Sequence, residues 1–273
     1  MTETVYSSDA ELRHPARFLA DAGDELRRSP AVAWRLFRSS VQARHRRAWL
    51  GYLWLLLPTL GTTAVWAYVR SRGLIETGAT AVPYLVYALS GTILWQVFAD
   101  SLVSPLQQLT ASRQLITRSR VPHEAFILAG VFDTLLNCAV RLLLLACVML
   151  AFGVPVGREV MLVPFGIAAL ALLGVTLGLF AAPLGLLYDD VGRALTMLAG
   201  FWFFLTPVVY PTPTRGLLRF NPVTPLLETT RQWLTSGAPL GRFVAVTSGA
   251  AAALVVAWLL HRLARPHVVA RLG

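Results

Sequence analysis

Six apolar runs along the chain approach the length of about 20 residues that a helix needs to cross a membrane. They lie at residues 49–69, 83–104, 125–152, 160–187, 194–210 and 243–263. Inside a bilayer each backbone polar group has to be satisfied within its own segment, so runs of this length predict helices. We therefore expect an all-α integral membrane protein. A tail of residues 1–48 precedes one domain of six transmembrane helices, residues 49–273.

The balance of charged residues agrees with a membrane protein and excludes one kind of enzyme. Only 14% of the residues are charged, against about 25% in soluble domains. All 24 basic residues are arginines, and a P-loop needs a lysine on the nucleotide phosphates. The net charge of +10 comes from arginines beside the apolar runs. It therefore indicates contact with membrane lipids, and we expect no nucleic-acid partner.

The distribution of the arginines predicts how the chain is oriented. If both termini are cytoplasmic, sixteen arginines lie on the inner side, seven on the outer side and Arg141 within the membrane. The opposite orientation would place those sixteen across the membrane, against the positive-inside rule. The exclusive use of arginine and the many alanines point to a bacterial genome rich in G and C. We expect a multi-pass protein of the bacterial plasma (inner) membrane with both termini cytoplasmic.

The cytoplasmic tail contains an amphipathic segment. Ser29-Pro30 is a start signal, a capping residue followed by a proline at the first helical position. Trp34, Phe37 and Val41 then recur at helical spacing, with arginines on the other faces. Such a helix lies in the plane of the membrane interface. Generic anchoring to the membrane and contact with a partner protein both fit this pattern.

The connector "RQLITRSRVPHEAF", residues 113–126, is basic and broken by a proline. Its charged and histidine residues and its proline are Arg113, Arg118, Arg120, Pro122, His123 and Glu124, and these six are the coupling candidates. The residue before a proline disfavours helix, so we expect a short cytoplasmic helix to end there and the third span to begin at His123. A rigid connector of this kind could transmit force from a cytoplasmic partner. Alternatively, it is a plain positively charged inner loop.

Polar residues follow one face of the third span. Asp133, Asn137 and Arg141 are spaced four residues apart, so they line one side of a single helix. Charges inside the bilayer are costly and normally face the bundle interior or water. The stripe therefore predicts a polar pathway, or else mutual satisfaction of Asp133 and Arg141 or pairing with Asp100 on the second span.

Aromatic residues gather in and after the fifth span. The set comprises Phe201, Trp202, Phe203, Phe204, Tyr210 and Trp233. Tryptophan and tyrosine collect at membrane interfaces anyway, so an aromatic belt is one interpretation. Four consecutive aromatic residues cover every face of a helix, however, and must include its inner side. Their flat apolar rings would suit sugar rings that slide past.

A pair of glycines in the fourth span and the segment between the last two spans give two further predictions. Gly174 and Gly178 in the fourth span have the spacing that lets membrane helices approach closely, and we expect packing rather than a gate. Between the last two spans, Asn221-Pro222 starts a segment at residues 224–235 that is too short to cross. A short re-entrant or interfacial helix on the outer face is expected.

Residues that could carry catalysis or bind metal are few. His123-Glu124 lacks the second histidine four residues later that a zinc helix needs. Asp189 and Asp190 form a carboxylate pair, but acids at the start of a helix explain them equally well. We expect no catalytic residue and no metal site in this chain.

The order of these features resembles the membrane subunits of type-2 ABC exporters that move polysaccharides, the O-antigen and teichoic-acid class. The similar stretches are residues 46–60, 90–129, 188–195, 205–211 and 221–237. They include a Pro-His-Glu motif, where the family usually has Pro-Arg-Glu, and a Tyr-Asp-Asp-Val motif, where it has Tyr-Arg-Asp-Val. The departures, His123 and Asp189, affect the contact chemistry at those two sites.

The resemblance implies a homodimer of six-span subunits that works with two copies of a separate ABC-type ATPase. The first inner loop would be the coupling helix that docks on the ATPase, and the Trp34 helix would lie beside it. ATP and Mg would be bound by that partner, with no cofactor in this chain. The substrate would be a lipid-linked glycan. An exporter of a small lipid or drug is one alternative, and a membrane-embedded glycan-lipid transferase using Asp189 and Asp190 is another.

Overall fold

The computed structural model describes residues 15–47, 53–74, 82–113, 115, 121–211, 220–235, 237 and 239–272. Within these ranges the chain is helical apart from short connections, and they contain no strand. The prediction of an all-α protein is confirmed for this part of the chain. Arg118 and Arg120 of the predicted coupling helix lie outside the described residues.

The elements follow one another along the chain as α1 Pro15–Arg47, α2 Leu53–Ser71, α3 Tyr84–Ala111, α5 His123–Ala151, the 3-10 helix η2 Arg158–Leu162, α6 Val163–Leu187, α7 Asp190–Leu205, α8 Val223–Gln232 and α9 Gly241–Leu272.

Four of the described helices are long and apolar enough to cross a membrane. They are Tyr84–Ala111, His123–Ala151, Arg158–Leu187 and Gly241–Arg265. They correspond to the second, third, fourth and sixth predicted spans. α2 has 19 residues and includes Arg70, and α7 has 16 residues, so both fall near or below the length of about 20 that a span requires. That these two helices also cross the membrane stays a prediction.

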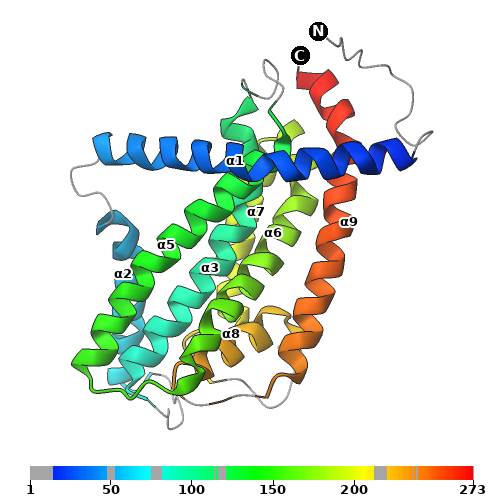
Figure 1. Cartoon of the computed structure of the whole chain (residues 1–273). Coiled ribbons are helices and arrows are strands. Elements are labelled where there is room, and N and C mark those ends of the chain that lie inside the picture. The colour runs from blue at the N-terminus through cyan, green and yellow to red at the C-terminus, as the bar shows by residue number, and fades with distance from the viewer. Residues whose placement is uncertain are drawn as a thin grey trace.

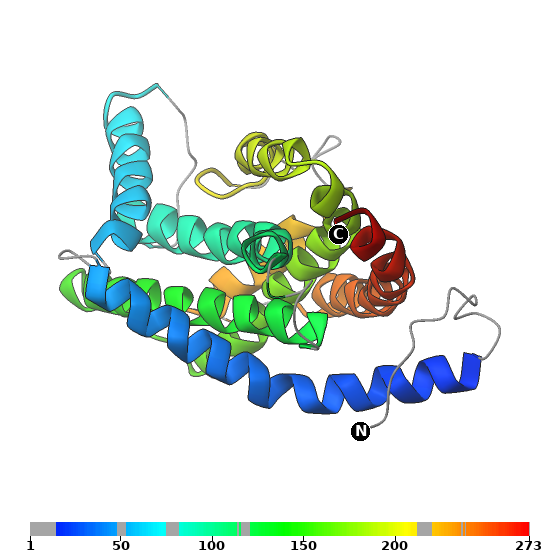
Figure 2. The ribbon, with the colours of Figure 1, turned by 90° about the horizontal axis from the view of Figure 1, so that it is seen from above.

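The long helices run side by side as a bundle, and α1 lies across one end of it (Figure 1). The last turns of α9 lie at the same end, which we call the α1 end. α8 lies at the opposite end, which we call the α8 end. Seen from above, α1 runs along the outer side of α5, and α2 stands at the rim, where it packs on α3 (Figure 2). α1 is thus placed to touch both α5 and α9.

The centre of the bundle is the pair α3 and α6. α3 packs against α6 and also against α2, α5, α7 and α8. A Cβ atom on Gly174 would lie 2.6 Å from the carbonyl oxygen of Phe98, and one on Gly178 would meet the carbonyl oxygen of Leu102. These two glycines therefore bring the backbones of α6 and α3 together. The interpretation of the glycine pair as a packing contact is confirmed.

The start of α1 differs from the prediction. The helix begins at Pro15, and Pro30 lies inside it. The hydroxyl of Ser29 donates to the carbonyl oxygen of Glu25 at 2.7 Å, one turn earlier, instead of capping a new helix. Glu25 also contacts α9, and tertiary contacts of this kind stabilise helical turns that local signals do not predict.

The starts of α5 and α8 agree with their proline signals. α5 begins at His123, directly after Pro122. Before α8, the side-chain oxygen of Asn221 accepts a hydrogen bond from the backbone N–H of Val223 at 3.0 Å, so Asn221 caps the short helix. That α8 is re-entrant stays a prediction.

Candidate functional site

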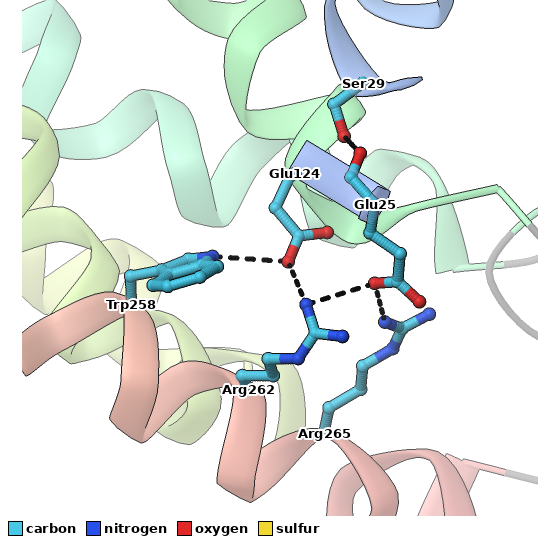
Figure 3. A network of polar contacts seen from close by, with 6 residues as sticks. All are labelled: Glu25, Ser29, Glu124, Trp258, Arg262 and Arg265. Atoms are coloured by element: carbon cyan, nitrogen blue, oxygen red, sulfur yellow. Dashed lines mark hydrogen bonds and ion pairs between the residues drawn. The ribbon is translucent and has the colours of Figure 1, made fainter. Parts of the chain in front are cut away.

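A cluster of charged residues joins three helices at the α1 end (Figure 3). Its members are Glu25 of α1, Glu124 of α5, and Trp258, Arg262 and Arg265 of α9, and we call it the Glu124 cluster. The Oε1 atom of Glu124 accepts from Trp258 Nε1 at 3.2 Å and from Arg262 Nη1 at 3.3 Å. Glu25 Oε2 lies 3.3 Å from Arg262 Nη1 and 3.0 Å from Arg265 Nη1.

The pair at the centre of this cluster is buried. The side chains of Glu124 and Arg262 are each 8% exposed. Removing one partner of a buried ion pair leaves the other charge uncompensated, at a cost of about 3–5 kcal/mol. Two carboxylates and two guanidinium groups balance the charge of the cluster. The arrangement therefore holds α1, α5 and α9 in a fixed relation.

His123 extends the cluster on its other side. Its ring centroid lies 5.9 Å from that of His261, and both side chains are buried. Among the described residues, no three side chains of His, Cys, Asp or Glu are grouped so that they could hold a metal ion. His123 and Glu124 of the Pro122-His123-Glu124 motif are thus turned into the protein, where both contact α9.

Arg113, at the start of the predicted coupling loop, contacts the connection between α6 and α7. It donates to the carbonyl oxygen of Leu186 at 3.0 Å and to Asp189 Oδ1 at 2.9 Å. It therefore joins the end of α3 to the connection between α6 and α7. Asp189, which replaces the arginine expected from the resemblance, forms an ion pair in this way.

An open pocket of about 460 Å³ adjoins this ion pair. It lies between the last turns of α3, the connection between α6 and α7, and the first turns of α7. Its polar lining residues include Gln107, Thr110, Asp189, Arg193 and Thr196. Leu106 and Val103 supply apolar walls. The pocket has the volume of a small-molecule site, but it is open and would not enclose a ligand.

The polar stripe of α5 is divided between two neighbouring helices. Arg141 Nη1 lies 2.7 Å from Asp100 Oδ2 of α3, so the predicted pairing with Asp100 is present. Asp133 is buried and accepts from the hydroxyl of Ser40 of α1 at 3.5 Å. Asn137 is half-buried between them. These contacts favour a packing role, and the role of the stripe as a translocation path stays a prediction.

The tryptophan and phenylalanine residues of α1 form an apolar contact with α5. The rings of Trp34 and Phe37 each lie 5.9 Å from that of Phe132. Trp34 remains 55% exposed, and Val41 is half-buried. The arginines Arg35 and Arg38 are exposed. The helix is amphipathic as expected, and its place at a membrane interface stays a prediction.

The aromatic residues of α7 face in two directions. Trp202 packs on Phe98 of α3 with ring centroids 5.2 Å apart, whereas Phe201 and Phe204 are 65% and 62% exposed. Phe204 also lies 6.4 Å from the ring of Trp66 on α2. α7 therefore carries an exposed aromatic face toward the side where α2 stands.

The remaining two aromatic candidates lie near the α8 end. Tyr210 is half-buried, and its hydroxyl donates to the carbonyl oxygen of Phe204 at 2.7 Å. Trp233 is only 2% exposed and packs on Phe243 of α9 at 4.9 Å. Within this single chain Trp233 is therefore a core residue, and its part in a path stays a prediction.

A buried arginine fixes the segment that follows α7. Arg231 of α8 donates to the carbonyl oxygens of Pro207 and Val208 at 3.1 and 2.7 Å. Gly91 of α3 makes room for this contact, because a Cβ atom there would meet both the Val208 carbonyl oxygen and the Arg231 guanidinium. The hydroxyl of Tyr84 donates to the carbonyl oxygen of Val209 at 3.0 Å.

Sequence reasoning missed two residues, Arg231 and Arg262. In the orientation argument each was counted only as a charge, Arg231 on the outer side of the membrane and Arg262 on the inner side. A signal existed for Arg262, which follows Trp258 by one helical turn at the end of an apolar run. Arg231 lies close behind Leu226 and Leu227, but nothing in its own segment indicates the carbonyl oxygens it binds.

The sequence matches the profile described as "ABC-2 type transporter" over residues 31–234. It is 26% identical over 201 residues to the O-antigen export system permease protein RfbA of Myxococcus xanthus, covering 70% of this chain and 75% of that protein. It is 20% identical over 204 residues to a protein of the same name from Klebsiella pneumoniae, with 72% and 77% covered. Because the profile covers more than half of the sequence, this multi-pass membrane chain belongs to the ABC-2 type transporter family.

Proposed function

We propose that this chain is the permease subunit of an ABC transporter that exports a lipid-linked glycan, such as an O-antigen, from the cytoplasm across the membrane. The observation that carries the proposal is the family match over residues 31–234 together with relatives that are O-antigen export permeases. The exposed aromatic face of α7 supports a substrate with sugar rings.

ATP hydrolysis belongs in this proposal to a separate ABC-type ATPase, in two copies on a homodimer of this chain. The absence of lysine from the sequence excludes a P-loop here. The loop that contains Arg118 and Arg120 would dock on the ATPase. Arg113, Pro122, His123 and Glu124 would carry its movement into α3 and α5.

The path for the glycan would follow the face that α7 shares with α2. Phe201 and Phe204 are exposed on this face, and Trp202 and Tyr210 flank them. In a homodimer the second copy would close the path from the other side. Flat aromatic faces offer a large apolar surface with few directional bonds, so a long polymer can slide along them.

The orientation in this proposal is that of a bacterial inner-membrane protein with both termini cytoplasmic. The α1 end would be the cytoplasmic end, with α1 in the membrane interface. Arg72 follows α2, Arg158 begins η2, and Arg242 lies in the first turn of α9. All three would then lie on the outer side of the membrane. Four inner elements, namely the tail, the two inner loops and the end of α9, hold the larger share of arginines.

The test is to reconstitute the chain with its ATPase subunit in vesicles. The lipid-linked glycan is supplied on the cytoplasmic face of the transporter. We expect ATP-dependent transfer of glycan only when both subunits are present. Charge reversal at Arg118 and Arg120 should abolish export, whereas the same change at exposed Arg158 should not. Export or ATP turnover by the chain alone would overturn the proposal.

One observation favours a second candidate, an exporter of a small lipid or drug. The 460 Å³ pocket between α3 and α7 has the size of a site for a drug-sized molecule. The same vesicles can test it with a fluorescent phospholipid and a cationic dye. Transfer of either compound without transfer of glycan would favour this candidate.

A further inference from the structure

Glu124 belongs to the connector, residues 113–126, that the proposed function assigns to coupling, and this inference rests on that function. It is the second residue of α5. Any displacement of the loop that contains Arg118 and Arg120 therefore reaches Glu124 within one helical turn of α5. The contacts that hold the first turn of α5 decide which other helices move with it.

α1 is seated directly on the first turns of α5. Ala33 of α1 is fully buried and belongs to the same apolar cluster as Ala125 and Ala129. Val121, at the end of the connector, and Leu36 pack against this cluster. Small residues bring the two helices close together, and Glu25 lies farther along α1 toward α9.

α9 closes the arrangement from the third side. Trp258 and Arg262 stand one turn apart, and both donate to the same oxygen of Glu124. The Nη1 atom of Arg262 also contacts Glu25, so one guanidinium group joins carboxylates from two other helices. Both contacts come from one nitrogen of the guanidinium, so this single group links the two carboxylates.

At its other end α9 reaches the α8 end of the bundle. Phe243, in its first turn, packs on buried Trp233 with ring centroids 4.9 Å apart. A single continuous helix therefore runs from the Glu124 cluster to the segment that follows α8. A helix transmits axial displacement along its whole length because its backbone hydrogen bonds are internal.

We propose that Arg262 is a positioning residue of the transport cycle. Through Glu124 and Glu25 it joins α1, the first turn of α5 and the last turns of α9 into one rigid body. When the ATPase moves the connector, this body moves as a unit, and α9 carries the displacement to the α8 end. The C-terminal helix is thus a working part of the coupling mechanism.

The first experiment measures how many glycans the reconstituted complex exports for each ATP hydrolysed. We expect Arg262→Met to lower this ratio about tenfold, within the range for mutations along a coupling network, while ATP hydrolysis continues. Arg262→Lys should recover only part of the ratio. Arg242→Met, at the opposite end of α9, is the matched control and should leave the ratio unchanged.

A merely structural role would give a different result. In that case Arg262→Met would reduce the amount of folded complex and lower export and hydrolysis in parallel, with the ratio between them unchanged. An unchanged ratio would overturn the inference. If the wild-type complex itself exports no glycan, the proposed function fails, and the second experiment still decides the inference.

The second experiment needs no substrate. Spin labels are placed on exposed positions of α1 and α9, by Arg28→Cys and Leu260→Cys, in a chain whose Cys138 and Cys147 are changed to serine. The distance between the labels in the complex with the ATPase should be the same with and without bound ATP. A shift of the distance distribution on ATP binding would show that α1 and α9 move apart and would overturn the rigid body.

Discussion

The guanidinium carbon of Arg231 lies 4.0 Å above the ring centroid of Tyr87, so that α8 and α3 hold the segment after α7 between them. The same arginine binds two carbonyl oxygens of that segment. The hydroxyl of Tyr87 adds a bond to the carbonyl oxygen of Tyr210 at 3.1 Å. The α8 end is thus fastened by side chains whose partners are backbone carbonyls.

Replacing Arg231 with methionine should destabilise the protein. The change leaves the carbonyl oxygens of Pro207 and Val208 without their donor in a buried site, at a cost of about 1–3 kcal/mol. Thermal unfolding of the purified chain in detergent checks this as a lower Tm. Exposed Arg242→Met is the control with the same change of charge, and an equal Tm for the two variants would contradict the prediction.

Adding a methyl group at Gly178 should separate α6 from α3. Alanine is a better helix former than glycine by about 1 kcal/mol, so Gly178→Ala would stabilise an open position. Here its Cβ atom would meet the carbonyl oxygen of Leu102, and we expect a lower Tm.

Gly200→Ala in α7 is the matched comparison for Gly178→Ala, because nothing lies within 4 Å of a Cβ atom at that position. Its Tm should stay the same or rise. If both alanine variants shift Tm in the same direction, the close approach of α6 and α3 does not determine stability.

The ion pair between Asp100 and Arg141 should behave as a structural contact. Arg141 is buried, so Asp100→Asn leaves its charge without a partner, and we expect a loss of about 3 kcal/mol. Adding Arg141→Met to Asp100→Asn should recover part of this loss. Unfolding measurements on the two single variants and the double variant form the cycle. Additive losses would show that the two residues act independently, as in a polar path.

The stability of the α8 end should depend on Glu228. Burial raises the pKa of this carboxyl group above 4.5, and nearby Arg231 and Arg242 oppose the rise. An acid with a raised pKa in the folded state binds a proton more tightly when folded. The free energy of unfolding therefore falls as pH rises from 4.5 through the raised value, and stays lower above it.

Glu228→Gln removes this dependence and should stabilise the chain at neutral pH. The Tm difference between Glu228→Gln and the original chain should grow as the pH is raised from about 4 to about 8. Thermal unfolding across that range measures it. Parallel curves for the two proteins would contradict a raised pKa.

The sequence predicted the elements whose cause is local. Apolar runs of sufficient length predicted the long helices, and Pro122 and Asn221 marked the starts of α5 and α8 within a residue or two. Gly174 and Gly178 predicted a close packing contact from their spacing alone. Each of these signals acts within one or two helical turns of the residue that carries it.

Spacing alone did not decide the contacts between distant helices. The pairing of Arg141 with Asp100, which is 41 positions away, was predicted only as one alternative, and the pairing of Arg262 with Glu124, which is 138 positions away, was not predicted. Spacing shows which side of a helix a charge occupies, but only the packed bundle shows which neighbour it meets. The extra turns of α1 before Ser29 have the same cause, because Glu25 finds its partners on α9.

The glycine contact between α6 and α3 also limits how these two helices can move. With the two backbones touching at Gly174 and Gly178, neither helix can slide or turn past the other without steric overlap. Larger excursions are left to the periphery, where α2 packs mainly on α3 and α7 rests on the central pair from one side. α3 and α6 would thus move together, as one unit, whenever the connector displaces α3.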